Sequence, residues 1–134
     1  MAIDGRITVD VLFHDTDGTA SLKVVSLEDS TEYTSGKVAI VTGTVGTSAV
    51  TVYSGGTTTP AYRDASGSIV SFSDISRVAL LGTPAVQASE PGANRVSARS
   101  SGELAVVSCF DSPSTISVIS DSGTSLYTLV IYGS

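Results

Sequence analysis

The chain has 134 residues, a formal net charge of −6 and a pI near 4.4. This length fits one domain, which typically takes roughly 100 to 150 residues. Hydrophobic residues make up 41% and charged residues 15% of the chain, and this balance is too apolar for intrinsic disorder. An acidic chain with two lysines and five arginines lacks the clustered cations that bind nucleic acid or anionic membranes. We therefore expect neither nucleic acid nor a membrane as a partner.

Apolar residues recur with a period of two along most of the chain, and this spacing predicts β-strands. In the first run, Ile7, Val9 and Val11 alternate with polar residues. Further short apolar runs follow at 22–27, 38–45, 49–53, 69–72, 75–81, 95–99, 104–110, 115–120 and 126–132. About nine or ten short strands at regular spacing predict an all-β fold, a single-domain antiparallel β-sandwich or β-barrel over residues 1–134.

Turn-forming residues separate these runs. Residues 15–19, 64–68 and 121–124 each combine an Asp, which can bond to its own backbone two residues on, with a Gly that tolerates positive φ. Longer loops are predicted at the acidic run 28–32 and at 82–84 and 89–94. The segment 73–76 fits either one helical turn or the edge of a strand.

Candidate catalytic and metal-binding groups are few. His14 is the only histidine, and the chain contains neither a G-x-S-x-G elbow nor an S-x-x-K motif that would accompany a nucleophilic serine. Asp15 and Asp17 resemble the start of a calcium loop, but Val24 stands where that loop needs a Glu. We therefore predict no enzymatic activity, no cofactor and no metal site, with a weak Ca²⁺ site near Asp15 and Asp17 as the open alternative.

Cys109 is the only cysteine, so no intrachain disulfide is available. It lies in an apolar segment without a neighbouring cation, and this setting predicts a small buried side chain and not a reactive thiol. Residues 1–6 lack a charged region followed by an apolar one, so we expect no secretory signal and synthesis in the cytoplasm.

Two kinds of residue are candidates for partner contact. The alternation in 95–99 predicts that Arg95 and Arg99 share one strand face, where they would either dock an acidic partner or guard a strand edge. Tyr127 and Tyr132, in the last apolar run, are the next candidates. The five tyrosines also allow a sugar-stacking surface, although the chain has no Trp.

Two stretches carry a resemblance that extends in composition over the whole chain. Residues 43–52 (GTVGTSAVTV) and 62–72 (YRDASGSIVSF) are rich in Ser, Thr, Gly and Val, as expected for short strands joined by tight turns. This composition resembles that of small virion structural proteins of tailed bacteriophages, of the capsid decoration or cement type.

The resemblance implies a β-sandwich or barrel without enzymatic activity that stabilises a phage head by bridging subunits. It further implies a homo-oligomer, with a trimer favoured, and a major capsid protein or another virion protein as the partner. The expected location is the virion, after synthesis in the host cytoplasm. The alternatives are a head–tail adaptor, tail or fibre-base component, and a carbohydrate-binding β-sandwich module.

We predict that metal chelation leaves the protein unchanged, because the calcium loop that begins at Asp15 is incomplete. The melting temperature with excess EDTA should equal that with added Ca²⁺, and Asp17→Ala should have the same melting temperature as the parent. A chelator-induced drop in melting temperature that Asp17→Ala abolishes would contradict this prediction.

Overall fold

The computed structural model describes residues 3–14, 21–33, 36–83, 86–90, 96–109 and 111–134. Every regular element in these ranges is a β-strand and every strand pairing is antiparallel, which confirms the all-β prediction. No helix in these ranges is long and apolar enough to cross a membrane. The chain divides into two compact units, residues 1–36 and 37–134. We predicted one domain over residues 1–134, whereas the sandwich itself is built from residues 37–134.

The first unit is a β-hairpin of β1 (Ile3–His14) and β2 (Ser21–Tyr33). Its register runs from Ile3 opposite Tyr33 to His14 opposite Ser21. The acidic run 28–32 lies inside β2, so the loop predicted there is wrong. Each of its residues pairs with a residue of β1, and a complete ladder of backbone hydrogen bonds outweighs the weak strand preference of Glu and Asp. The turn predicted at 15–19 lies outside the described residues.

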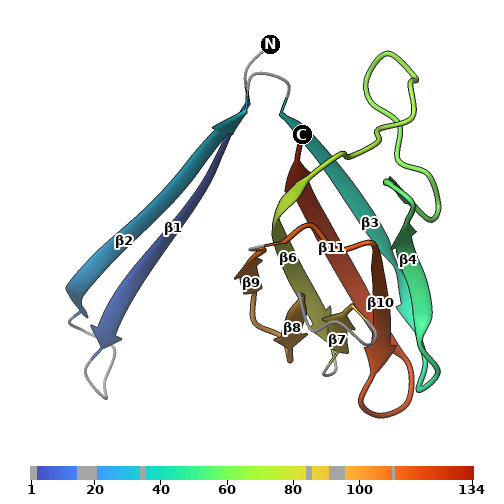
Figure 1. Cartoon of the computed structure of the whole chain (residues 1–134). Helices are drawn as coiled ribbons and strands as arrows, with labels where there is room; N and C mark the ends of the chain where they lie inside the picture. The colour runs from blue at the N-terminus through green and yellow to red at the C-terminus, as the bar shows by residue number, and fades with distance from the viewer. Residues whose placement is uncertain (1–2, 15–20, 34–35, 84–85, 91–95, 110) are drawn as a thin grey trace. The chain divides into compact units, whose positions relative to one another are not determined.

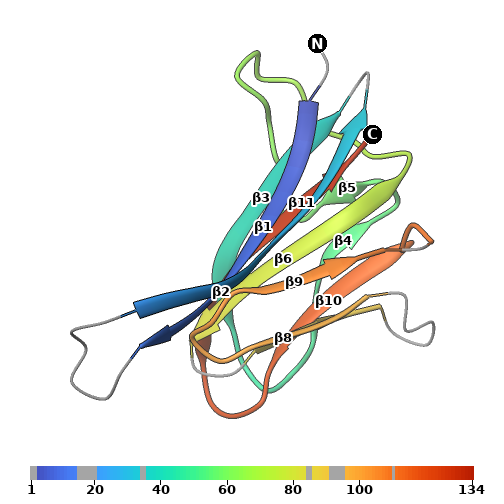
Figure 2. The same ribbon diagram turned by 90° about the vertical axis from the view of Figure 1, so that its left-hand side faces the viewer.

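The second unit is a β-sandwich of two sheets, seen as two layers in Figures 1 and 2. The five-stranded sheet has the order β5 (Thr57–Thr58), β4 (Val50–Ser54), β10 (Thr115–Ser120), β7 (Val86–Ser89) and β8 (Ser97–Ser100). The four-stranded sheet has the order β3 (Lys37–Val45), β11 (Ser125–Gly133), β6 (Ile75–Thr83) and β9 (Ala105–Ser108). In the described chain these sheets do not close into a barrel, so the sandwich alternative holds.

The hydrophobic core lies between the two sheets. Alternate residues of each strand point inward, as the period of two requires. The largest fully buried apolar side chains come from both sheets: Ile75, Leu80, Leu129 and Ile131 from the four-stranded sheet, and Ile116, Val52, Val86 and Val118 from the five-stranded sheet. Burial of each such side chain contributes about 1.5–3 kcal/mol relative to exposure.

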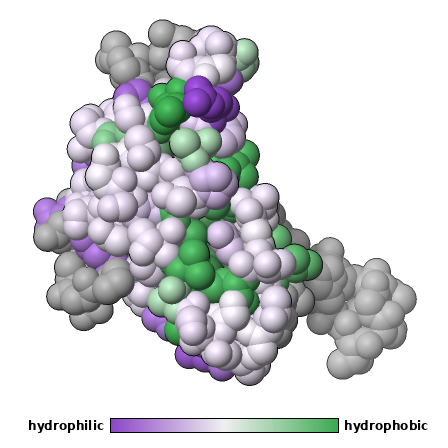
Figure 3. Space-filling model, turned by 90° about the vertical axis from the view of Figure 1, so that its right-hand side faces the viewer, coloured by the Kyte–Doolittle hydropathy of each residue, from purple (hydrophilic) through white to green (hydrophobic). Residues whose placement is uncertain are grey.

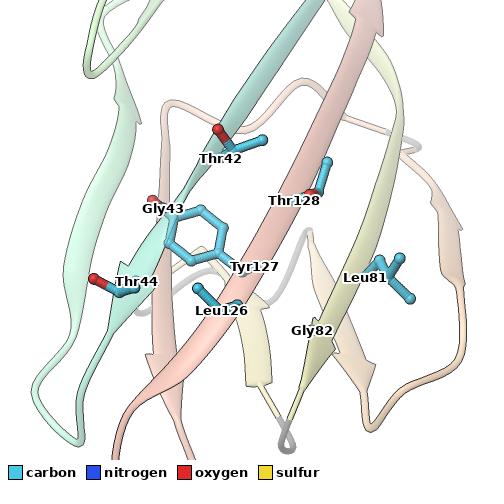
Figure 4. Close-up of a pocket in the computed structure, with 8 residues that line it drawn as sticks. All are labelled: Thr42, Gly43, Thr44, Leu81, Gly82, Leu126, Tyr127 and Thr128. Carbon is cyan, nitrogen blue, oxygen red and sulfur yellow. The ribbon is translucent and has the colours of Figure 1, made fainter.

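Two glycines make room inside this core beside Tyr127. On β3, Gly43 lies directly opposite Tyr127, and a Cβ there would be 3.3 Å from the tyrosine hydroxyl oxygen. Figure 4 shows the Tyr127 ring extending from β11 across Gly43. On the other side, Gly82 of β6 also pairs with Tyr127, and a Cβ there would lie 1.7 Å from Cγ1 of the buried Val86. The two sheets therefore approach closely at Gly82.

A long connection, residues 59–74, joins β5 to β6 and extends beyond the ends of the strands in Figure 1. The turn predicted within it is confirmed. Asp64 Oδ1 accepts hydrogen bonds from the Ser66 and Ser68 backbone N–H groups at 2.8 and 3.0 Å, and Gly67 has a φ of 86°. The strand predicted at 69–72 is reduced to isolated bridges, and 73–76 has no helical turn, since β6 begins at Ile75.

We predict that Gly82→Ala lowers the free energy of unfolding by about 1 to 3 kcal/mol, because the added methyl group overpacks the core against Val86. Urea denaturation measures this difference. Gly46→Ala is the matched control, since a Cβ there would have nothing within 4 Å, and it should change stability by less than about 0.5 kcal/mol. Equal stabilities of the two variants would contradict the close approach at Gly82.

Candidate functional site

The candidate site is the outer face of the four-stranded sheet, meaning the strand positions that point away from the core. The register of β3, β11, β6 and β9 defines it. Its described members are Val38, Ile40, Thr42, Thr44, Leu126, Thr128, Val130, Tyr132, Arg77, Ala79, Leu81, Val106 and Ser108.

This outer face is unusually apolar for a surface. Eight large hydrophobic residues are exposed in the described chain, and five of them lie here: Val38, Ile40, Leu81, Val106 and Leu126. Leu126 is 66% exposed and Ile40 45%. An antiparallel sheet with one solvated face normally carries polar residues on that face. A contiguous apolar patch on a surface marks an interaction site.

The outer face of the five-stranded sheet provides an internal comparison. By register its described positions include Thr51, Ser117, Ile119, Gln87, Ser89, Ser97 and Arg99. All but Ile119 are polar or charged, and Thr51 and Ser117 are within hydrogen-bond distance through their hydroxyl groups at 3.4 Å. Figure 3 shows the molecule from the right-hand side of Figure 1, where pale residues of intermediate hydropathy dominate and green patches are separate. The apolar character of the other outer face is thus a property of that face and not of the whole surface.

The apolar outer face is also hollowed at one end. A hollow of about 440 Å³ is lined by residues of β3, β11 and β6: Thr42, Gly43, Thr44, Leu81, Gly82, Leu126, Tyr127 and Thr128 (Figure 4). Its side chains are threonine and leucine, with Tyr127 beside them. None of the described residues that line this hollow is Asp, Glu, Lys or Arg, and this described lining suits apolar contact better than it suits an ion.

Tyr127 and Tyr132, which sequence analysis named as partner-binding candidates, are both buried. Tyr127 is 8% exposed, and its ring belongs to the sandwich core. Tyr132 is 6% exposed and lies on the outer face between Val38 and Arg77, where Arg77 is also buried. Neither ring is available as a broad surface contact, whereas Leu126, which precedes Tyr127 on the same strand, is exposed.

Only one of the two arginine candidates lies in the described part of the chain. Arg99 lies on β8, an edge strand, with its side chain 69% exposed and paired with the carboxylate of Asp121. Arg95 lies outside the described residues, and β8 begins only at Ser97. The guanidinium of Arg99 has five N–H donors, so its pairing with Asp121 leaves donors for another carboxylate. Docking through these arginines stays a prediction.

Cys109 is the most perturbed titratable group described. It is partly buried against the core. Burial, followed by the nearby carboxylates of Asp74 and Glu90, raises the pKa of the Cys109 thiol from 9.0 to about 11. A thiolate nucleophile needs the opposite environment, with a cation that lowers the pKa. The prediction of an unreactive structural cysteine therefore agrees with this setting.

His14 ends β1, and Asp15 and Asp17 lie outside the described residues. Among the described residues no three His, Cys, Asp or Glu side chains gather as metal ligands would. The buried Glu90 has a structural role, because its Oε1 accepts hydrogen bonds from the Ser114 backbone N–H and Oγ at 2.9 and 3.0 Å.

Sequence analysis missed the outer face, although its signal was present. The runs 38–41 and 129–132 are continuously apolar, a pattern typical of strands covered on both sides. The run 97–100 instead alternates, with Ala98 inward and Arg99 exposed. Distinguishing continuous runs from alternating ones would have indicated which strands need cover on both sides.

We predict that Cys109 of the folded protein is alkylated at about pH 8 about a hundredfold more slowly than in urea, because the raised pKa leaves less thiolate. The rate should rise with pH up to about 11. Iodoacetamide labelling followed by mass spectrometry measures both rates. The control is Ser101→Cys in a Cys109→Ser background, because Ser101 is exposed. This cysteine should be alkylated equally fast in the folded protein and in urea. Equal rates for Cys109 in the folded protein and in urea would contradict the prediction.

Comparison of the chain with protein-family models, with curated proteins and with solved structures finds no match. A function therefore has to be argued from the residues themselves. The feature that distinguishes this molecule is the apolar outer face of the four-stranded sheet, on a sandwich whose other outer face is mainly polar.

Proposed function

We propose that the protein is a non-enzymatic structural subunit that works through contact area, as a capsid decoration protein of a phage head. The observation that carries the proposal is the apolar outer face of the four-stranded sheet. A cement protein bridges neighbouring subunits and needs surfaces that bind without chemistry. Five exposed large hydrophobic residues on one face supply such a surface.

The composition of this face supports assembly. Its side chains are mainly Val, Ile, Thr and Leu. Such side chains have few rotamers to lose when an interface forms, so ordering them costs less free energy than ordering Lys, Glu or Arg. The virion assignment rests on the resemblance in composition, and the contact face adds a physical means of assembly to it.

The four tyrosines of the sandwich count against the carbohydrate-binding alternative. Tyr53, Tyr127 and Tyr132 are all less than 9% exposed, and Tyr62 is partly buried against the core. Stacking on a sugar ring needs an exposed aromatic face. The adaptor alternative differs in oligomer number, since an adaptor forms a ring of high order, and measurement of the mass in solution separates the two.

The proposal is tested first by whether a neighbouring reading frame encodes a major capsid protein, and then by cosedimentation with capsids assembled from that protein. We expect saturable, stoichiometric binding and a higher melting temperature of the decorated particles. Arg99→Ala should fold normally and bind more weakly, with a larger loss at low salt, because screening weakens ion pairs. Arg63→Ala, which removes another exposed arginine, is the control and should bind as the parent does.

Absence of binding by the parent protein at every salt concentration would overturn the capsid proposal. If Arg99→Ala binds capsids as tightly as the parent does, the capsid decoration proposal stands and Arg99 is not part of the docking surface.

A further inference from the structure

We infer that the apolar outer face of the four-stranded sheet binds the same face of a second copy of this chain. The inference rests on the proposed structural role and assigns this face to contact between copies, which leaves docking on the shell to other surfaces, such as the edge strand that bears Arg99. It starts from the uneven distribution of charge over the molecule.

The described acidic residues of the sandwich all lie outside its strands: Asp64, Asp74, Glu90, Glu103, Asp111 and Asp121. None of the described positions of the outer face is acidic, and its one charged residue, Arg77, is 7% exposed. Of the net charge of −6, residues 1–36 contribute −5 and the sandwich, residues 37–134, contributes only −1, so two sandwiches meet without strong net repulsion. A face without exposed charge is where two such chains can meet.

The same chemistry favours a second copy over a partner of another kind. A basic partner would be recognised by carboxylates, and an acidic partner by exposed arginines or lysines. The described part of this face offers neither. Its exposed leucine, isoleucine, valine and threonine side chains match a surface of the same composition. A face that binds itself is related to its partner by a two-fold axis, so every contact is made twice. This contact gives a dimer and not the trimer that the resemblance implies.

The size of the face is sufficient for association. Three of its strands, β3, β6 and β11, have nine residues each, and β9 has four. With ~3.3 Å per residue and ~4.8 Å between strands, the face covers roughly 500 Å² in each copy. The roughly 1,000 Å² buried in total is at the lower end of specific interfaces. We therefore expect an association in the micromolar range that a larger assembly reinforces.

Sedimentation equilibrium of the full chain tests the inference. Ile40→Glu places a carboxylate on the face, and Ile69→Glu is its matched control on the 59–74 connection, because the two isoleucines are 45% and 48% exposed. We expect Ile40→Glu to raise the self-dissociation constant at least about tenfold and Ile69→Glu to change it less than about twofold. Leu126→Glu, at a position 66% exposed, should behave as Ile40→Glu does. Unchanged circular dichroism establishes that each variant folds.

A charge-exchange experiment distinguishes self-association from another occupant. An equimolar mixture of Ile40→Glu and Ile40→Lys should associate more tightly than either variant alone, since the mixed dimer holds opposite charges in one interface and each unmixed dimer holds like charges.

Three results would overturn the inference: a parent chain that is monomeric throughout the micromolar range, equal effects of Ile40→Glu and Ile69→Glu, or no gain on mixing. Capsid binding by a monomeric parent would leave the proposed function intact. Self-association through this face without capsid binding would support the inference and overturn the proposed function.

Discussion

The sandwich depends on β11, which pairs with β3 along its whole length and with β6 from Leu126 to Gly133. Because alternate residues of a strand belong to opposite faces, this pairing assigns Leu129 and Ile131 to the core and Leu126 and Val130 to the outer face. Both sets are apolar. The central strand therefore creates the hydrophobic core and the apolar outer face together, and a shift of its register by one residue would exchange the two.

Polar groups inside the molecule serve the fold. Glu90 holds the segment before β10 through Ser114, and the hydroxyl groups of Ser120 and Ser125 lie 2.6 Å apart where β10 turns into β11. These bonds satisfy buried polar atoms that would otherwise destabilise the core. Together with a Cys109 thiol whose pKa is raised to about 11, they form an interior suited to stability and not to catalysis.

The contrast between the two outer faces connects structure with function. One face carries Ser, Thr, Gln and Arg and can stay in water, whereas the other exposes Ile40, Leu81 and Leu126. Exposed apolar area costs free energy until a partner covers it. The described acidic residues of the sandwich lie outside its strands, whereas in the hairpin the run Glu28 to Glu32 lies inside β2. The proposed contacts rest on the sandwich face whose described positions expose no charge.

The sequence by itself determined the all-β class, the approximate positions of most strands and the turn at Asp64, because period-two alternation and Asp–Gly turns are local properties of a chain. It also indicated a structural Cys109. It did not determine that residues 1–36 form a separate unit or that the acidic run 28–32 is strand, since both depend on pairing between distant segments. Only the tertiary structure decided that Tyr127 lies in the core and that Ile40 and Leu126 are exposed. A continuous apolar run has no polar side to mark its outer face, so its two faces are distinguished only by the sheet that packs against one of them.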